Sequence, residues 1–191
     1  MRFLSFQIKN FKGIKDTTVP LKSVAGASVF AFVGLNESGK TTVLEAIHSF
    51  APDEATSELL GGEDGLGVPF RERVPRHSLS EFTGDVSVSA VLELDPTDKE
   101  KIATTIREKN ELDLRVETLP DQVTLERQQR FESGDFKNSS FSLGTKCEIK
   151  NPKQRNWRAA NSQEESSAVR DAIFLHAPRI AYFPTFGRLC T

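Results

Sequence analysis

One eight-residue stretch, Gly34-Leu35-Asn36-Glu37-Ser38-Gly39-Lys40-Thr41, has residue types and a spacing that suit phosphate binding. It fits the pattern GxxxxGK[ST] at every fixed position. The two glycines permit backbone conformations that turn successive amide N–H groups toward an anion. Lys40 would place its ammonium against the β- and γ-phosphates of a nucleoside triphosphate, and Thr41 would offer a hydroxyl ligand to Mg²⁺. The residues predicted to contact the nucleotide are Gly34, Asn36, Glu37, Ser38, Gly39, Lys40, Thr41 and Thr42.

The segments on either side of this loop are predicted to position it. Residues 28–33 are apolar on both faces, which predicts a buried parallel strand. After the loop, Val43, Ile47 and Phe50 recur at helical spacing and predict a helix from near Lys40 to before Pro52. The helix start would bring its free amides and Thr42 to the α-phosphate. Because strand, spacing and helix agree, a chance glycine-rich turn explains the stretch poorly.

Composition describes a globular chain without a membrane anchor. The length of 191 residues suits one substantial domain or one large lobe with an insertion, and the composition, 37% hydrophobic and 27% charged, is that of a globular protein. No run approaches the roughly 18 apolar residues of a membrane span, and the first residues lack the apolar core of a signal peptide. The expected location is therefore cytoplasmic, with no membrane partner.

The net charge and the positions of the cysteines and histidines argue against several other classes of protein. The formal net charge of −2 gives no global positive field for nucleic acid, although a local patch would suffice. The two cysteines, Cys147 and Cys190, are far apart, which argues against a zinc site or a disulfide framework. The three histidines are scattered without metal-ligand or triad spacing.

Periodicity divides the chain into five predicted segments. These are N-terminal antiparallel strands at 1–27, the strand, loop and helix at 28–50, a loop or insertion at 51–82, an antiparallel β-rich subdomain at 83–160, and a helix with a strand at 161–186. Within them, Asp95-Pro96 and Ser162-Gln163-Glu164-Glu165 predict helix starts. Short strands are expected at 114–119, 123–131, 141–143, 147–149 and 180–183.

Residues around the loop resemble the RecF and SMC (structural maintenance of chromosomes) ATPases. Asn36 and the following Leu44-Glu45-Ala46-Ile47 are similar to that group's GxNxxGK[ST]…L-[ED]-A-I pattern. Residues 6–14 resemble its first strand and turn, written I-x-N-[FY]-[KR]. Similar stretches near 86–94 and 178–184 make the ATPase half of OLD (overcoming lysogenization defect) endonucleases the nearest likeness. The resemblance is specific over residues 3–50 and loose beyond them.

This resemblance implies an α/β P-loop NTPase of the ABC-ATPase head type, with a mixed sheet and an antiparallel β-subdomain. It further implies an ATPase that uses ATP and Mg²⁺ in DNA repair, recombination or anti-phage defence. The turn after the first strand would lie beside the nucleotide. Lys12 would then contact a phosphate or base, or else would be a solvated turn residue.

The family's other catalytic parts are not recognisable in these residues. Leu59-Leu60-Gly61-Gly62-Glu63 imitates the signature motif but comes too soon after the loop. Residues 90–95 imitate a Walker B segment, yet they lie in an alternating strand and Asp95 serves as a helix cap. We therefore expect only the first lobe of the head, truncated before the catalytic segment. Its partner would be a second ATPase head, as a homodimer or as the missing C-terminal lobe.

A cluster of basic residues around one tryptophan is a second candidate site. Basic side chains interleaved with an aromatic ring can follow a phosphate backbone and stack on a base. A solvated loop is the competing interpretation. The cluster consists of Lys150, Lys153, Arg155, Trp157 and Arg158, with Lys146 nearby.

Two other functions remain open for the predicted loop. A small nucleotide kinase would suit the length, but such kinases usually begin directly with the loop strand and carry an arginine-rich lid. A non-hydrolysing regulatory module, or a remnant of an ATPase, would bind ATP without turnover.

Overall fold

The computed structural model describes residues 1–21, 29–35, 39–54, 68–75 and 78–182 of the chain. Its internal contacts divide the chain into two units. Unit 1 comprises Met1–Ser5, Ala90–Glu126 and Phe141–Pro178, and unit 2 comprises Phe6–Ser89, Arg127–Ser140 and Arg179–Thr191.

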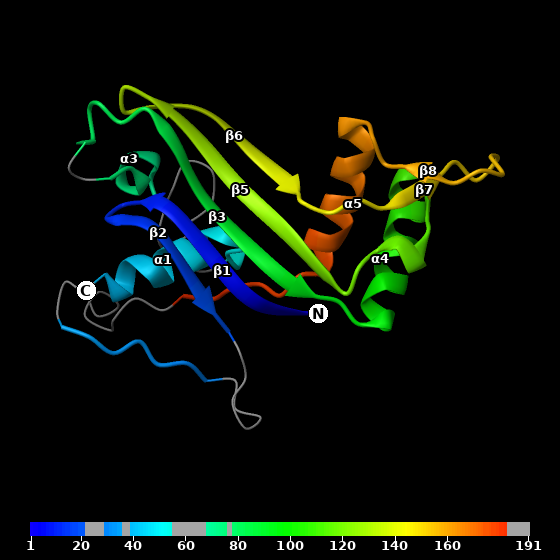
Figure 1. The fold of residues 1–191 in the computed structure, drawn as a ribbon, viewed down its shortest axis with the longest axis horizontal. Coiled ribbons are helices and arrows are strands. Elements are labelled where there is room, and N and C mark those ends of the chain that lie inside the picture. Colours follow the sequence, from blue (N-terminus) through cyan, green and yellow to red (C-terminus); the bar gives the residue numbers. More distant parts are fainter. Residues whose placement is uncertain (22–28, 36–38, 55–67, 76–77, 183–191) are drawn as a thin grey trace. The chain divides into compact units, whose positions relative to one another are not determined.

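A five-stranded sheet has the order β2-β1-β3-β5-β6, and neighbouring strands run in opposite directions (Figure 1). Its strands are β1 (Arg2–Phe11), β2 (Ile14–Pro20), β3 (Gly84–Glu93), β5 (Gln122–Glu132) and β6 (Asp135–Leu143). Strand β1 confirms the first predicted strand and β3 the alternating one. Strand β6 is longer than the predicted 141–143. Its added residues are 135–140, of which 137–140 are polar and exposed, so no apolar alternation marks them.

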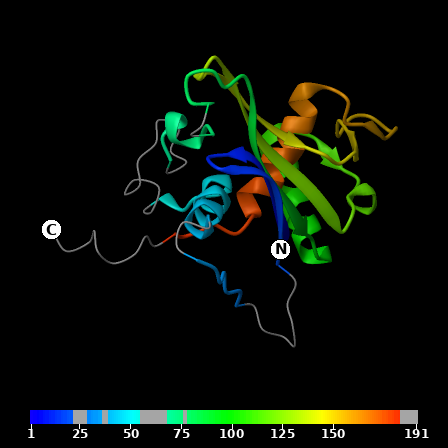
Figure 2. The same cartoon turned by 60° about the vertical axis from the view of Figure 1, so that its left-hand side comes forward.

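In unit 2, helix α1 (Lys40–Phe50) lies alongside the β1–β2 hairpin in both views of the molecule (Figures 1 and 2). The ring of Phe50 meets that of Phe6 edge-on at 5.8 Å, and both side chains are fully buried. The Nε of Arg127 donates to the carbonyl oxygen of Phe50 at 2.6 Å. These contacts confirm the predicted helix and fix its C-terminal end.

Unit 2 also contains an aromatic cluster that anchors the four-residue helix α3 (Phe70–Arg73). Phe70 stacks on Phe136 at 3.9 Å, Phe136 meets Phe131 edge-on, and Phe131 lies 6.2 Å from Phe82. At the β5–β6 turn, the amide of Gly134 donates to the carbonyl of Phe82 at 2.9 Å. The hairpin turn and the segment before β3 are therefore held together.

In unit 1, helices α4 (Pro96–Asn110) and α5 (Gln163–His176) lie side by side in both views (Figures 1 and 2). Their facing positions are buried aliphatic residues. The Oγ1 of Thr105 and the Nε2 of His176 are 2.8 Å apart and add a polar link. The buried aliphatic residues of the two helices are Ile102, Ile106, Ala168, Val169, Ala172 and Ile173.

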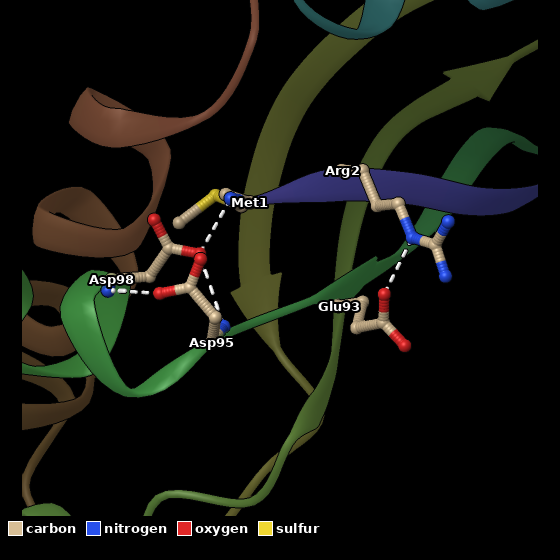
Figure 3. Close-up of polar contacts among 5 residues, drawn as sticks. All are labelled: Met1, Arg2, Glu93, Asp95 and Asp98. Atoms are coloured by element: carbon tan, nitrogen blue, oxygen red, sulfur yellow. Dashed lines mark hydrogen bonds and ion pairs between the residues drawn. The ribbon is translucent and has the colours of Figure 1, made fainter. Parts of the chain in front are cut away.

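Both predicted helix starts in unit 1 are confirmed as capping boxes. Asp95 accepts from the Asp98 amide while Asp98 accepts from the Asp95 amide, and Ser162 and Glu165 repeat the arrangement. Figure 3 shows that the Met1 ammonium also pairs with Asp98. Burial acts to raise the pKa of Asp98, but the hydrogen bond from Met1 and the Asp95 amide leave it below its usual value.

A three-stranded sheet completes unit 1, in the order β4 (Asp113–Leu114), β7 (Glu148–Lys150), β8 (Arg158–Ala159). The strand predicted at 114–119 is wrong beyond Leu114, because residues Val116–Thr118 form a 3-10 helix. Cys147 is buried beside this sheet, and burial raises the pKa of its thiol to about 11. Such a thiol is un-ionised at neutral pH and chemically inert.

The strand predicted at 28–33 is also wrong, since described residues 29–35 form no strand. Their side chains are largely exposed, with Val29 at 88% and Val33 at 94%. A strand that is apolar on both faces needs a paired neighbour and a covering layer on each side. None of the described residues supplies that pairing. The strand predicted at 180–183 is reduced to one parallel bridge, between Ile180 and Pro52.

Candidate nucleotide-binding site

The structure describes both ends of the predicted phosphate loop, Gly34–Leu35 and Gly39–Thr42, whereas Asn36, Glu37 and Ser38 lie outside the described residues. Gly39 is the N-cap of α1 with φ +85°, a left-handed conformation that favours glycine. It makes no side-chain cap hydrogen bond, and the first turn of α1 carries no acidic residue. A helix start without acidic side chains presents a favourable dipole to an anion.

Lys40 spans the loop from the first turn of α1. Its Nζ donates to the carbonyl oxygen of Gly34 at 2.9 Å and to that of Leu35 at 2.5 Å. The ammonium thus lies at the Gly34–Leu35 end of the predicted phosphate loop. Thr41 is exposed and Thr42 is half-buried at the same helix start. A hydroxyl oxygen is a ligand type that Mg²⁺ accepts, so Thr41 fits the predicted metal role.

Lys12 occupies the turn between β1 and β2, and it is not solvated. The residue is only 7% exposed, with φ +52°. Its Nζ lies 2.7 Å from Oε2 of Glu45 on α1 and 3.8 Å from Oε2 of Glu72 on α3. Its amide donates to the carbonyl of Arg73 at 2.7 Å. The interpretation of Lys12 as a solvated turn residue is wrong, while its contact with nucleotide stays a prediction.

Glu45 is the residue of this region that sequence reasoning missed. It lies four positions after Thr41, and residues so spaced share one face of a helix. The acidic position of the L-[ED]-A-I pattern was a usable signal. Its partner, 33 residues earlier in the chain, could not be read from spacing.

The structure describes one of the two stretches that resemble catalytic motifs and not the other. Residues 90–93 lie in β3 with alternating burial, and Asp95 caps α4, which confirms that this stretch is not a Walker B segment. Leu59–Glu63 lies outside the described residues. Among the residues that the structure does describe, no group of three His, Cys, Asp or Glu side chains could hold a metal ion.

The predicted basic cluster lies in unit 1, apart in sequence from the loop. Lys150 on β7 lies over the Trp157 ring at 4.7 Å and 3.8 Å from Asp113. Arg158 on β8 pairs with Glu165, and this hydrogen bond lowers the pKa of Glu165 to about 2. Lys153 and Arg155 are exposed. The structure brings Lys150 and Trp157 together, and nucleic-acid binding by the cluster stays a prediction.

His48, on helix α1, is expected to make the stability of the chain depend on pH. It is fully buried, and its pKa is lowered from 6.5 because burial disfavours the imidazolium, although Asp53 acts in the opposite direction. The unfolded chain therefore binds the proton more readily, so stability is full above pH 6.5 and declines as the pH falls below it.

We accordingly expect the free energy of unfolding of the wild-type chain to fall more steeply than that of His48→Gln between pH 7.5 and pH 5.5, measured by urea titration. His77 and His176 are present in the wild type and in the variant, so their contributions to the pH dependence cancel in the comparison. Parallel pH profiles would show that His48 ionises equally well in the folded and unfolded states.

Comparison with known proteins places this site in a family. Residues 1–183 match the family model described as the AAA ATPase domain. The chain belongs to this AAA ATPase domain family. Membership confirms the expected P-loop ATPase and its α/β class. A likeness to OLD endonucleases stays a prediction.

Other similarities of this AAA ATPase domain are more distant. A solved structure from work on ATP-driven dimerization and DNA-stimulated activation of SMC ATPases is 15% identical, with a TM-score of 0.46. The match covers 91% of this chain and 80% of that chain. No curated protein sequence matches. Among the described residues, no helix is long and apolar enough to cross a membrane.

Proposed function

We propose that this AAA ATPase domain binds ATP with Mg²⁺ at Gly34–Thr42 and acts as the nucleotide-binding lobe of a RecF/SMC/OLD-like ATPase. The observation that supports this most strongly is the placement of Lys40, whose ammonium donates from the first turn of α1 to the Gly34 and Leu35 carbonyls. A bound triphosphate would exchange these neutral carbonyl acceptors for charged phosphate oxygens, which form stronger hydrogen bonds.

Each residue of the site has one role in this proposal. The amides at the start of α1 bind phosphate oxygens, and Lys40 neutralises the terminal phosphates. Thr41 would hold Mg²⁺, which supplies Lewis-acid stabilisation of the phosphates when bound. None of the described residues forms a Walker B pair to activate water. In this proposal, residues of a second ATPase lobe or head activate the water for hydrolysis.

The segment that leads into the loop, together with Leu35 of the loop, supports such a partner. Val29, Phe30, Phe32, Val33 and Leu35 all expose a large part of their side chains. Burying a side chain of this kind stabilises a complex by about 1.5–3 kcal/mol. Because this segment is apolar on both faces, it suits a position between strands of a second ATPase lobe, where helices would cover it. The biological setting we propose is DNA repair, recombination or anti-phage defence.

Binding of a fluorescent ATP analogue to the purified chain tests the nucleotide site. We expect Lys40→Ala to weaken binding by roughly 10- to 100-fold, because a charged hydrogen-bond donor to phosphate is lost. Lys9→Ala, which removes an exposed lysine from β1, is the matched control and should bind like the wild type.

The same preparation separates the competing functions. Equal binding by the wild type and Lys40→Ala would contradict the proposed site. Phosphoryl transfer to a nucleoside monophosphate would indicate a kinase instead. Binding without turnover, even when a complementary ATPase lobe is added, would indicate a regulatory module. Rapid hydrolysis by this chain alone would show that it contains its own catalytic residues.

A further inference from the structure

The turn between β1 and β2 adopts a backbone conformation that is uncommon for its residues. Asn10 and Lys12 both have positive φ, at +54° and +52°. A residue other than glycine is strained in this conformation and keeps it only where its surroundings hold it. Here the side-chain amide of Asn10 donates to the carbonyl of Asp85 at 2.8 Å, and the Lys12 amide donates to that of Arg73. The turn is therefore built to hold Lys12 in one place.

The ammonium of Lys12 faces α1 rather than solvent. Its side chain is 9% exposed and that of its partner Glu45 is 24% exposed, so the pair is largely removed from water. Glu72, at 3.8 Å and 62% exposed, is a weaker second partner. Burying a lysine is costly unless its charge is compensated. Glu45 provides that compensation from the helix that carries Lys40 and Thr41.

The position of Glu45 on α1 explains why the nucleotide site needs this pair. Glu45 follows Thr41 by one helical turn, so an unpaired carboxylate there would lie on the same helix face as the proposed Mg²⁺ ligand. A triphosphate carries several negative charges, and a like charge nearby opposes its binding. Lys12 cancels that charge and also joins α1 to the β1–β2 turn.

We propose that Glu45 and Lys12 form a positioning pair for the nucleotide site, in which Lys12 neutralises Glu45 and does not itself contact nucleotide. This inference rests on the proposed function, since it concerns how the loop of α1 is kept ready for a triphosphate. It differs from a phosphate-contacting role for Lys12, in which Glu45 would compete with the nucleotide for the same ammonium.

A double-mutant cycle on the full chain separates these two roles. The variants are Lys12→Met, which keeps the aliphatic stem, Glu45→Gln, which keeps the shape, and the two combined. We expect Lys12→Met to weaken ATP-analogue binding about tenfold and Glu45→Gln to leave it within about twofold. The double variant should recover to within about twofold of the wild type, because the unpaired carboxylate is gone.

Binding is measured at a temperature where circular dichroism shows every variant folded, so that loss of fold cannot imitate loss of affinity. A double variant as weak as Lys12→Met would overturn the inference, because it would mean that Lys12 itself contacts the nucleotide. Unchanged binding by Lys12→Met would overturn it as well. Rescue by the Glu45→Gln substitution would not occur if Lys12 acted on the turn independently of Glu45.

Thermal unfolding of the nucleotide-free variants distinguishes failure of the pair from failure of the proposed function. Both single variants should lower the midpoint, and the double variant should lower it by less than the sum of the two. Additive effects would overturn the pair. If the midpoint shifts are coupled but the wild-type chain binds no ATP analogue, the proposed nucleotide site is contradicted, and with it the role of the pair at that site.

Discussion

Replacing Gly134 with alanine is expected to lower the free energy of unfolding by about 3 kcal/mol, through backbone strain and a steric clash. Gly134 has φ +79°, which L side chains rarely adopt. An added Cβ would lie 2.1 Å from the carbonyl oxygen of Leu79 and 3.1 Å from the Cα of Ser80. These are backbone atoms, so the β5–β6 turn would have to move away from residues 79–82. The hydrogen bond from Gly134 to Phe82 would be lost with it.

Thermal unfolding measures this loss, which corresponds to a fall of roughly 6–12 °C in the midpoint for a chain of this size. Gly13→Ala is the matched control. Gly13 also lies in a hairpin turn, but its φ is not positive and a Cβ there would meet nothing within 4 Å. We expect that control to change stability by less than about 0.5 kcal/mol. Equal midpoints for the two variants would mean that the β5–β6 turn does not pack on residues 79–82.

The second large effect is expected at Phe50, where alanine should cost about 3–5 kcal/mol. Phe50 is fully buried at the end of α1 and meets Phe6 edge-on. Truncation removes that aromatic contact and leaves a cavity that the surrounding sheet cannot fill. Because α1 also carries Lys40 and Thr41, we expect ATP-analogue binding to weaken together with stability.

Urea unfolding and analogue binding should be measured on the same preparations of Phe50→Ala. Leu44→Ala is the matched control on α1, since the Leu44 side chain is 38% exposed and little packing is lost. That control should cost less than about 1 kcal/mol. If the two variants lose stability equally, Phe50 does not anchor the helix. If Phe50→Ala is destabilised but binds the analogue normally, the loop does not depend on that anchor.

The two predictions concern opposite ends of one set of contacts in unit 2. Gly134 holds the β5–β6 turn against Phe82, and Phe136 on β6 stacks on Phe70 of α3. The Arg73 carbonyl of α3 accepts a hydrogen bond from the Lys12 amide. Phe50 holds α1, whose Glu45 receives the Lys12 ammonium. Lys12 therefore joins both ends. We expect substitutions at either end to affect nucleotide binding through the same turn.

Local features were predictable from the sequence by itself. The phosphate loop is a contiguous pattern, and family membership confirms the ATPase class that it indicated. Helix α1 follows from the spacing of Val43, Ile47 and Phe50, and the capping boxes at Asp95 and Ser162 join residues three positions apart. All of these depend on interactions between near neighbours in the chain, which spacing records directly.

Only the tertiary structure decided the features that depend on distant partners. Residues 29–33 have the apolarity of a buried strand, but a strand also needs neighbours, and none of the described residues pairs with them. Polar residues 137–140 do form part of β6, because backbone pairing with β5 does not require apolar side chains. The burial of Lys12 depends on a carboxylate 33 residues away and a carbonyl on α3. The sequence determines which side chains can bind a phosphate, whereas the tertiary structure determines which charged side chains lie next to them.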